Sequence, residues 1–516
     1  MRRGGVVRRT LPLKTSPARM PRLFVFLLRI FPLLLASLPA LAGEDAPRPD
    51  SMRFNLESAI QGALAKNFAI QVQRFEPRIA REAITQELGK FDPVLDFSYE
   101  RAENEQHDIF DNGLHFPTRI HTRQNNYSLG LSGKTPLGLS YDLGLGSRGV
   151  LGDLDPINDL YTTTGSISLR QSLLRDFGPA ANLAQVRIAR NNAMVSEWQL
   201  RQRIIDVITQ TVFVYNELHL ARENLGVAIR SRELARQLLK DNQARMEIGV
   251  KSPLDVTEAR TSVAAREEGV ILAERTILDN ENLLKQLVTN DLESMLGVRV
   301  EIAPPPYEPF RADVPAGIRQ ALTIRPDYRQ AVLEIERRNI TLAYTRNQAL
   351  PRFDLVGSLA HLGFENDLVG SLGRVTNQDE THWTIGAIIS IPIPNREGRS
   401  AANAAKLEAA KSLIALQQLE QQIVVDVDNA SGQIVTSRQR ITSTSEASRL
   451  AKETLDAAEE RLRAGSGTTF EVLDFQSKLA EAEAAELRAR ADYNKAVSEY
   501  HRQTGTALEV HHVVLN

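Results

Sequence analysis

The chain has 516 residues, enough for several domains or for one elongated domain, and only 6% of them are aromatic. It contains no cysteine, which excludes disulfide bonds and thiolate metal sites. The 62 basic and 64 acidic residues nearly balance, at a formal net charge of −2.

The N-terminal residues 1–42 have the pattern of a secretory signal peptide. Basic residues precede an apolar run from Leu23 to Leu38, and small residues then lead to a cleavage site after Ala42. The true start is either Met1 or Met20, and a twin-arginine signal or a membrane anchor are the alternatives. The segment holds 8 of the 62 basic residues and none of the 64 acidic ones, so removing it leaves 54 against 64, a net charge of −10. This balance argues against nucleic acid as a partner.

Four long, charged stretches without an internal proline predict long helices. Apolar residues recur in them at spacings of three and four, which is typical of a coiled-coil seam. The longest stretch would be on the order of 100 Å long as a helix. The helices are expected from Ala180 to Ile248, Leu254 to Leu296, Ser400 to Ala464 and Thr468 to Thr504, and the seam of the first at Ile204, Val207 or Ile208, Val212, Tyr215, Leu218, Leu225, Ile229, Leu234 and Leu238.

Other segments alternate between apolar residues and mostly Ser, Gly or Asp, less cleanly at 353–359, which predicts strands with one apolar and one polar face. Odd-numbered residues such as Leu129, Leu143 and Ile167 form the apolar face. Beyond the signal, no apolar run is long enough to cross a bilayer as a helix, so a membrane crossing would need a β-barrel. A soluble β-sandwich shows the same alternation and is the alternative. The strands are expected near 94–103, 126–133, 139–147, 162–172, 353–359 and 383–391.

The chain also contains a two-fold internal repeat. Each half consists of a helical pair, strands and a long helical hairpin, and the proline-rich residues 303–306 join the halves, where regular helix is excluded. Such halves suit a barrel shared by several chains. The matching residues are Pro93 and Leu95 with Pro351 and Phe353 at an offset of 258, and Arg245 and Gly249 with Arg461 and Gly465 at an offset of 216.

Four motifs, which follow one another along the chain in the expected order, carry a family resemblance. RMEIGVKSPLDVTEAR (245–260) and RLRAGSGTTFEVLDFQ (461–476) look like the hairpin tips of the TolC-type outer-membrane efflux protein family. SLRQSLLRDFGPAANLAQVRIAR (168–190) resembles the family's strand-to-helix transition, and FNLESAIQGALAKNF (54–68) resembles its N-terminal helix. Together they cover nearly the whole chain after the signal.

The resemblance implies an α+β fold in which a trimeric, composite transmembrane β-barrel continues into a long, antiparallel α-helical barrel in the periplasm. It implies a homotrimer in the cell outer membrane, in contact with outer-membrane lipid and docked by a periplasmic adaptor and an inner-membrane pump. The expected segments are 1–42 signal peptide, 43–92 N-terminal helices, 93–172 first barrel segment, 173–297 hairpin 1, 298–315 proline-rich equatorial connector, 316–350 second-repeat helices, 351–399 second barrel segment, 400–505 hairpin 2 and 506–516 C-terminal tail.

The hairpin tips carry the candidate site. Glycine tolerates the positive φ of a helix end, Ser252 and Thr468 or Thr469 can cap the returning helices, and Asp255 suits a first helical turn. Glu471 and Asp474 share one helical face, and the resemblance implies that they form an acidic gate with Asp255. Leu462 and Gly467 stand where relatives have polar residues that hold the gate closed, so this lock does not transfer. The tip residues expected to dock the adaptor are Gly249, Val250, Ser252, Gly465, Ser466 and Thr468.

The function implied is a passive exit duct for efflux or type I secretion, without enzyme activity, cofactor or metal. The sequence has no metal-binding His-Glu motif, phosphate loop or cysteine nucleophile, and His511-His512 is expected to be a surface tail. The alternatives are an exported coiled-coil structural protein or adhesin without a pore, and a secreted hydrolase.

The strand count departs from the family pattern of two strands per half. The first half shows four candidates, joined by a short turn at 134–138 and by long loops at 104–125 and 148–161. Short turns facing the periplasm and long loops facing outward are typical of membrane barrels. The chain therefore contributes six strands to the barrel, or it contributes four and folds the extra hairpin over the mouth.

Overall fold

The computed structural model describes residues 51–107, 119–152, 160–377 and 380–513, and the expected signal peptide lies outside them. The chain in these ranges combines long helices with two sheets, a small parallel one and a larger antiparallel one. The shorter helices are α1 (Leu56–Lys66), α2 (Phe68–Gln73), α3 (Glu76–Leu88), α4 (Gly178–Asn182), α7 (Val314–Ile324), α8 (Pro326–Gln348), α9 (Leu368–Asn377) and α12 (Ala507–Val510), with a 3₁₀ turn, η1 (Gly89–Phe91).

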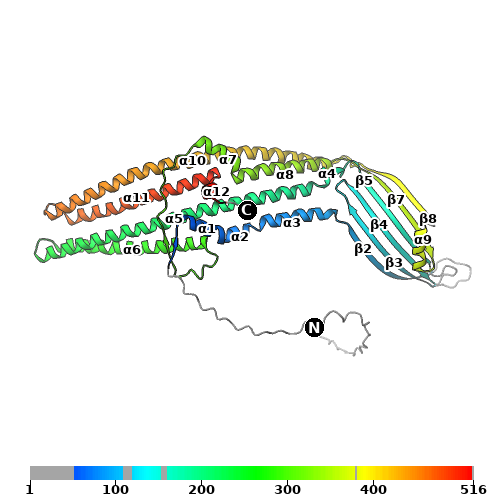
Figure 1. Ribbon diagram of the computed structural model, residues 1–516, viewed down its shortest axis with the longest axis horizontal. Coiled ribbons are helices and arrows are strands. Elements are labelled where there is room, and N and C mark those ends of the chain that lie inside the picture. The colour runs from blue at the N-terminus through cyan, green and yellow to red at the C-terminus, as the bar shows by residue number, and fades with distance from the viewer. Residues whose placement is uncertain (1–50, 108–118, 153–159, 378–379, 514–516) are drawn as a thin grey trace, which may run out of the picture. The chain divides into compact units, whose positions relative to one another are not determined.

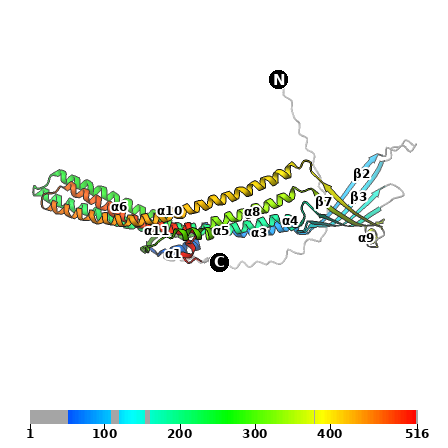
Figure 2. The same ribbon diagram turned by 90° about the horizontal axis from the view of Figure 1, so that it is seen from above.

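The larger sheet of the described residues has six antiparallel strands in the order β2-β3-β4-β5-β7-β8. Within this sheet, each strand pairs with the next strand of the sheet along the chain. β5 pairs with β7, although the long helices and β6 lie between them in the sequence (Figures 1 and 2). All strands expected from alternation are confirmed. Their bounds are β2 (Val94–His107), β3 (Arg119–Lys134), β4 (Leu139–Gly152), β5 (Leu160–Ser172), β7 (Arg352–Glu365) and β8 (Glu380–Ser390).

The strand register runs one apolar row and one polar row of partners across all six strands, on opposite faces of the sheet. Directly paired residues point to the same side, so each row of partners belongs to one face. The odd-numbered row is therefore apolar as expected, whereas the even-numbered row is polar or small. The rows are Leu95, Leu131, Leu143, Ile167, Leu359 and Trp383 on one face, and Asp96, Gly130, Gly144, Ser166, Ala360 and His382 on the other.

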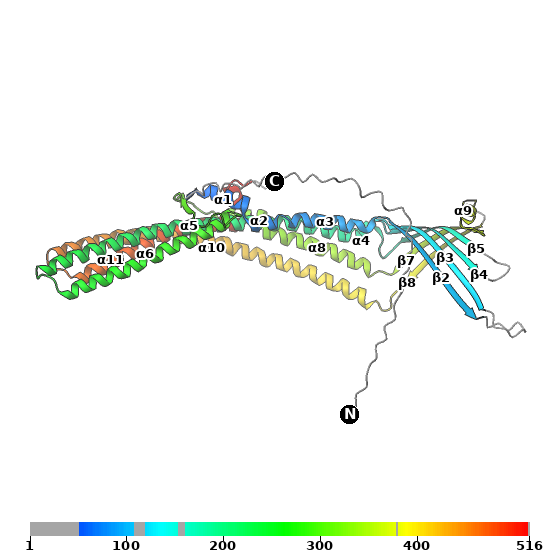
Figure 3. The same cartoon turned by 90° about the horizontal axis from the view of Figure 1, so that it is seen from below.

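Two long helical hairpins follow the strands: α5 (Ala184–Glu247) with α6 (Pro253–Val288), and α10 (Arg396–Arg463) with α11 (Thr469–Thr504). Figure 3 shows the members of each hairpin side by side. The four expected helices are confirmed with shifted ends: α5 begins at Ala184 after a break at Leu183, and α10 begins at Arg396. The largest shift is in α6, which stops at Val288 rather than Leu296. There, Thr289 Oγ1 accepts a hydrogen bond from Asp291 N at 3.1 Å, and such local side-chain bonds compete with helix. None of the helices in the described ranges is long and apolar enough to cross a membrane.

The seam of α5 follows the expected residues in its first half and changes in its second. Ile204, Ile208 and Val212 are buried, as predicted. Farther along, Ile229 and Leu234 are exposed, which corrects the predicted seam. In the second half the predicted Leu238 is buried, together with the smaller side chains of Val227, Ser231 and Ala235.

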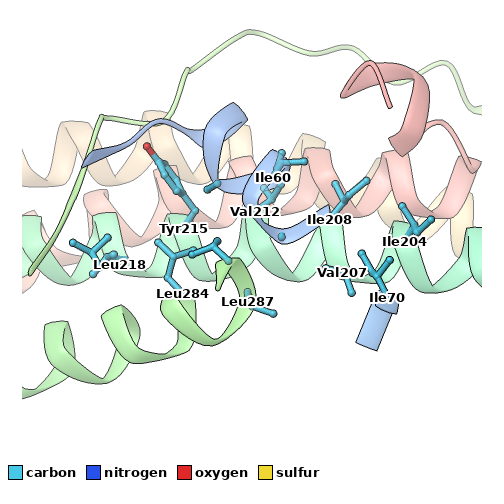
Figure 4. Packing of buried hydrophobic residues seen from close by; sticks show 14 residues of the cluster. Ile60, Ile70, Ile204, Val207, Ile208, Val212, Tyr215, Leu218, Leu284 and Leu287 are labelled. Atoms are coloured by element: carbon cyan, nitrogen blue, oxygen red, sulfur yellow. The ribbon is translucent and has the colours of Figure 1, made fainter. Parts of the chain in front are cut away.

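The first core cluster lies where α1 and α2 pack on α5 and α6 (Figure 4). Tyr215 is fully buried there, and its hydroxyl donates to the carbonyl oxygen of Ala303 at 2.6 Å. This bond holds the chain next to β6 (Arg299–Ile302), which pairs in parallel with β1 (Ser51–Phe54). The small β1–β6 sheet was not expected, because its strands are four residues long and far apart in sequence.

The proline-rich connector is held by tyrosines of α11. Tyr493 Oη accepts from Phe310 N at 2.7 Å and donates to Glu308 O at 3.0 Å, and Tyr500 Oη donates to Asp313 O at 3.0 Å. Proline has no backbone N–H, so a proline-rich segment cannot form the regular hydrogen bonds of a β-sheet. Side chains such as these tyrosines pair with its remaining backbone N–H and C=O groups instead.

Candidate functional site

The two hairpins reverse direction in the same way. Gly249 has φ +77° and Gly465 has φ +78°, the left-handed conformation that favours glycine. After each glycine, a backbone N–H returns to an arginine carbonyl: Val250 N donates to Arg245 O at 2.8 Å, and Ser466 N to Arg461 O at 3.0 Å. The positive φ predicted for both glycines is confirmed.

Both returning helices begin with a complete capping box. The Ser252 hydroxyl accepts from Asp255 N at 3.3 Å, and the Asp255 carboxylate accepts from Ser252 N at 3.1 Å. Likewise, the Thr468 hydroxyl accepts from Glu471 N at 3.2 Å, and Glu471 Oε2 accepts from Thr468 N at 3.2 Å. Thr468 is therefore the cap, and each acidic residue supplies half of it.

The Asp255 carboxyl has a strongly acidic character. Partial burial disfavours its charged form, but hydrogen bonds from Ser252 and Thr469, together with the charge of Lys251, outweigh this effect and lower its pKa to about 2. Asp255 is therefore a carboxylate at any physiological pH. Its negative charge is compensated within the tip, by the hydrogen bond from Ser252 N and by Lys251.

A polar cluster ties the tip of hairpin 1 to hairpin 2. The hydroxyl of Thr469, which is fully buried, accepts from Lys251 Nζ and from Asn242 Nδ2, both at 3.2 Å. In addition, the Arg245 guanidinium donates to the carbonyl oxygen of Leu462 at 3.1 Å. We call these five residues the tip tie. Together they join the end of α5 to the turn between α10 and α11.

Packing around the turn of hairpin 2 explains the departures at positions 462 and 467. The Leu462 side chain is buried in an apolar cluster with Leu238 and Val472, so it makes only apolar contacts. The carbonyl oxygen of Leu462 accepts the hydrogen bond from Arg245 instead. At Gly467 an added Cβ would lie 3.0 Å from Leu462 N, a tight contact that a larger residue could make only if the backbone of the turn shifted. The sequence did not identify Asn242, Lys251 or Thr469 as partners, although a buried asparagine in a helical seam is a signal for such a contact.

Asp474 lies at the edge of a groove of about 960 Å³ between α5, α6 and α11. Lys478 Nζ lies 2.7 Å from its carboxylate, so its charge is compensated locally. Deeper in the groove, Arg266 donates to the Ser231 hydroxyl on α5 and, at 3.3 Å, to Leu473 O on α11. Burial lowers the pKa of the Arg266 guanidinium, which remains charged. Glu471, whose carboxylate is held in the capping box, lies about one helical turn before Asp474 on α11.

Apolar side chains are exposed around both turns. Val250 is 66% exposed and Phe470 is 68% exposed, and both flank the capped helix starts. Ile248 and Leu254 are exposed beside Val250. Exposed apolar residues grouped at one end of a molecule are typical of a surface that binds another protein.

The fold has long paired helices next to one antiparallel sheet. Comparison with known protein families and solved structures shows which family has this fold. The family model for the outer membrane efflux protein family matches residues 59–290 and 317–505. The chain therefore belongs to this family of outer-membrane channel proteins, which are not enzymes, and it is located in the outer membrane.

Individual relatives agree with the family. The chain is 22% identical to the outer membrane protein TolC of Vibrio cholerae over 308 residues, which cover 59% of this chain and 68% of that protein. Its fold is similar to the CmeC outer membrane channel of Campylobacter jejuni, with a TM-score of 0.67, 18% identity and coverage of 88% and 86%. The open state of the Neisseria gonorrhoeae MtrE channel gives a TM-score of 0.61, 18% identity and coverage of 88% and 89%.

Proposed function

We propose that three copies of this chain form a passive exit duct for efflux or type I secretion. The duct consists of a composite β-barrel and a helical barrel built from two related halves of each chain. A periplasmic adaptor docks at the hairpin tips, and an inner-membrane pump supplies the energy. The observation that carries the proposal is the pair of matching tips, with capped turns, exposed apolar residues and a polar tie between the hairpins.

Surfaces along the long helices support assembly. Ile271 and Leu272 on α6 are 65% and 59% exposed in the single chain, and Leu407 on α10 is 71% exposed. Large apolar side chains in such positions are stabilised when neighbouring helices cover them. A closed ring of hairpins provides this cover.

The tips act as the gate in this proposal. The tip tie holds the two hairpins of one chain together and keeps the tips closed. Glu471 and Asp474 of three chains then lie near the axis, where their charges attract cations. Lys478 weakens this attraction, because it is paired with Asp474. Docking of the adaptor on the exposed apolar residues opens the gate by separating the hairpins.

Single-channel conductance with a trivalent cation tests the gate. Glu471→Gln combined with Asp474→Asn retains hydrogen-bond acceptors for the cap, and it should raise the half-blocking concentration at least tenfold from the periplasmic side. Lys478→Gln should have the opposite effect, since it leaves Asp474 uncompensated.

The matched control is Glu446→Gln with Glu453→Gln on α10, where both carboxylates pair with Arg449. This pair removes the same charge away from the tips, so the block should not change. Equal block in wild type and in the tip variant would show that Glu471 and Asp474 do not line the pore.

A further inference from the structure

The six-stranded sheet has no point at which one hairpin separates from the rest. β3 pairs with β2 from Val94 with Ser132 onward, and with β4 from Thr122 with Gly152 to Lys134 with Ser140. The apolar row that begins at Leu95 continues without interruption to Trp383. A hairpin folded over the mouth of a barrel would break this ladder or reverse its faces.

The two edge strands of this sheet, β2 and β8, are each unpaired on one side within the described chain. Their apolar faces are strongly exposed: Phe97 is 73% exposed, and Ile385 on β8 is 75% exposed. Sheet edges are not tolerated in the hydrocarbon region of a membrane, because backbone N–H and C=O groups would lack partners. Each edge therefore requires another strand of comparable length.

A second copy of this chain supplies such a strand. Along the sheet the direction alternates, so with six strands β8 is antiparallel to β2. An antiparallel ladder can then continue from β8 of one copy to β2 of the next. The odd-numbered apolar face also continues across this contact, since Phe97 and Ile385 both belong to it.

We infer that all six strands belong to the barrel wall and that β8 of each chain pairs with β2 of its neighbour, which closes an eighteen-stranded barrel in the trimer. This inference rests on the proposed trimer. Barrels of 16–18 strands leave an aqueous channel, and their diameter increases with strand number. The outer-membrane pore is therefore wider than the twelve-stranded barrel that four strands per chain would form. Small residues such as Gly130, Gly144 and Ser166 face its interior.

Cysteine crosslinking tests the contact between chains, and the natural sequence contains no cysteine to interfere. Ile385→Cys on β8 is combined in turn with Phe97→Cys, Tyr99→Cys or Arg101→Cys on β2, all on the odd-numbered face. The matched controls combine Ile385→Cys with Ser98→Cys or Glu100→Cys, which point to the other face. A third series combines Ile385→Cys with Leu143→Cys or Leu145→Cys on β4. The protein is crosslinked in outer membranes with a short thiol-specific reagent, and its mass in detergent is measured separately.

Covalent trimers from at least one odd-numbered β2 variant, and none from the even-numbered controls, are the expected result. Covalent trimers from the β4 series would overturn the inference, because they would place β4 at the contact and leave only four strands in the wall. A trimer by mass that no β2 variant crosslinks would also overturn it. A monomer by mass would reject the proposed function as well, so the two failures are distinguishable.

Discussion

Thr469 shows how one hydroxyl connects two segments that are more than two hundred residues apart. It accepts hydrogen bonds from Lys251 and Asn242, and all three polar groups are shielded from water to different degrees. Asn242 is only 1% exposed. Loss of a partner for such a buried donor costs about 1–3 kcal/mol, because the donor remains desolvated.

Thr469→Val should therefore loosen the tips without changing the shape of the side chain. We expect faster amide hydrogen exchange in both hairpin tips and a larger channel conductance. The matched control is Thr257→Val on α6, whose exposed hydroxyl bonds only to Pro253 O of its own helix at 3.0 Å. Unchanged exchange in the Thr469 variant would show that the tip tie does not hold the hairpins together.

We expect His501 to make the stability of the C-terminal segment depend on pH. Burial lowers its pKa from 6.5 to about 4, the nearby His511 contributes in the same direction, and the ring hydrogen-bonds to the Thr506 hydroxyl at 3.0 Å. The folded pKa is depressed, so the contribution of neutral His501 to stability is complete above about pH 6.5 and is lost as the pH falls to about 4.

Amide hydrogen exchange in α12, corrected for the intrinsic rate, should thus accelerate between pH 7 and pH 5. His501→Gln should remove most of this pH dependence, because glutamine does not titrate. His511→Gln should remove less of it, although burial also lowers the pKa of His511. A pH dependence that is the same in wild type and in His501→Gln would contradict this assignment.

Helix α9 is positioned by glycines in the strands beneath it. Ser371 of α9 is fully buried, and its hydroxyl shares a hydrogen bond of 2.7 Å with Thr163 on β5. A Cβ on Gly363 would lie 2.7 Å from Val375 N, so the helix packs directly on the strand backbone. Thr163 and Gly363 belong to the odd-numbered rows, so α9 covers part of the apolar face of the sheet.

Gly363→Val should displace α9, because overpacking a close contact typically costs 1–3 kcal/mol. We expect faster trypsin cleavage after Arg374 in membranes that contain the folded protein. Gly130→Val on β3 is the control, since nothing lies within 4 Å of its added Cβ. Equal cleavage rates in both variants would show that α9 does not depend on this glycine.

For the assembled molecule, the strand register predicts which face meets lipid. Leu129 belongs to the apolar face and Ser128 to the opposite face, next to each other on β3. Leu129→Arg should destabilise the trimer by roughly 2–4 kcal/mol near the membrane midplane, whereas Ser128→Arg faces the lumen and should cost much less. Unfolding by urea from lipid vesicles measures the difference. Equal destabilisation would contradict the assignment of the two faces.

Several features of the molecule could be predicted from its residues alone. The two faces of the sheet, the long helices and the capped glycine turns depend on patterns within a few residues, such as Leu129 beside Ser128 or Gly249 before Ser252. Local alternation and turn chemistry are strong signals because each residue's backbone preference contributes directly to them.

Other features depended on contacts between distant segments. The tip tie needs Asn242 to meet Thr469, α9 needs Ser371 to meet Thr163, and the single six-stranded ladder needs β5 to meet β7. The second half of the α5 seam also changed, because Ser231 and Ala235 rather than Leu234 face the neighbouring helices. Periodicity shows which faces are apolar, but not which partner covers each face. That choice follows from packing and hydrogen bonding in the folded chain, and therefore only the tertiary structure decided it.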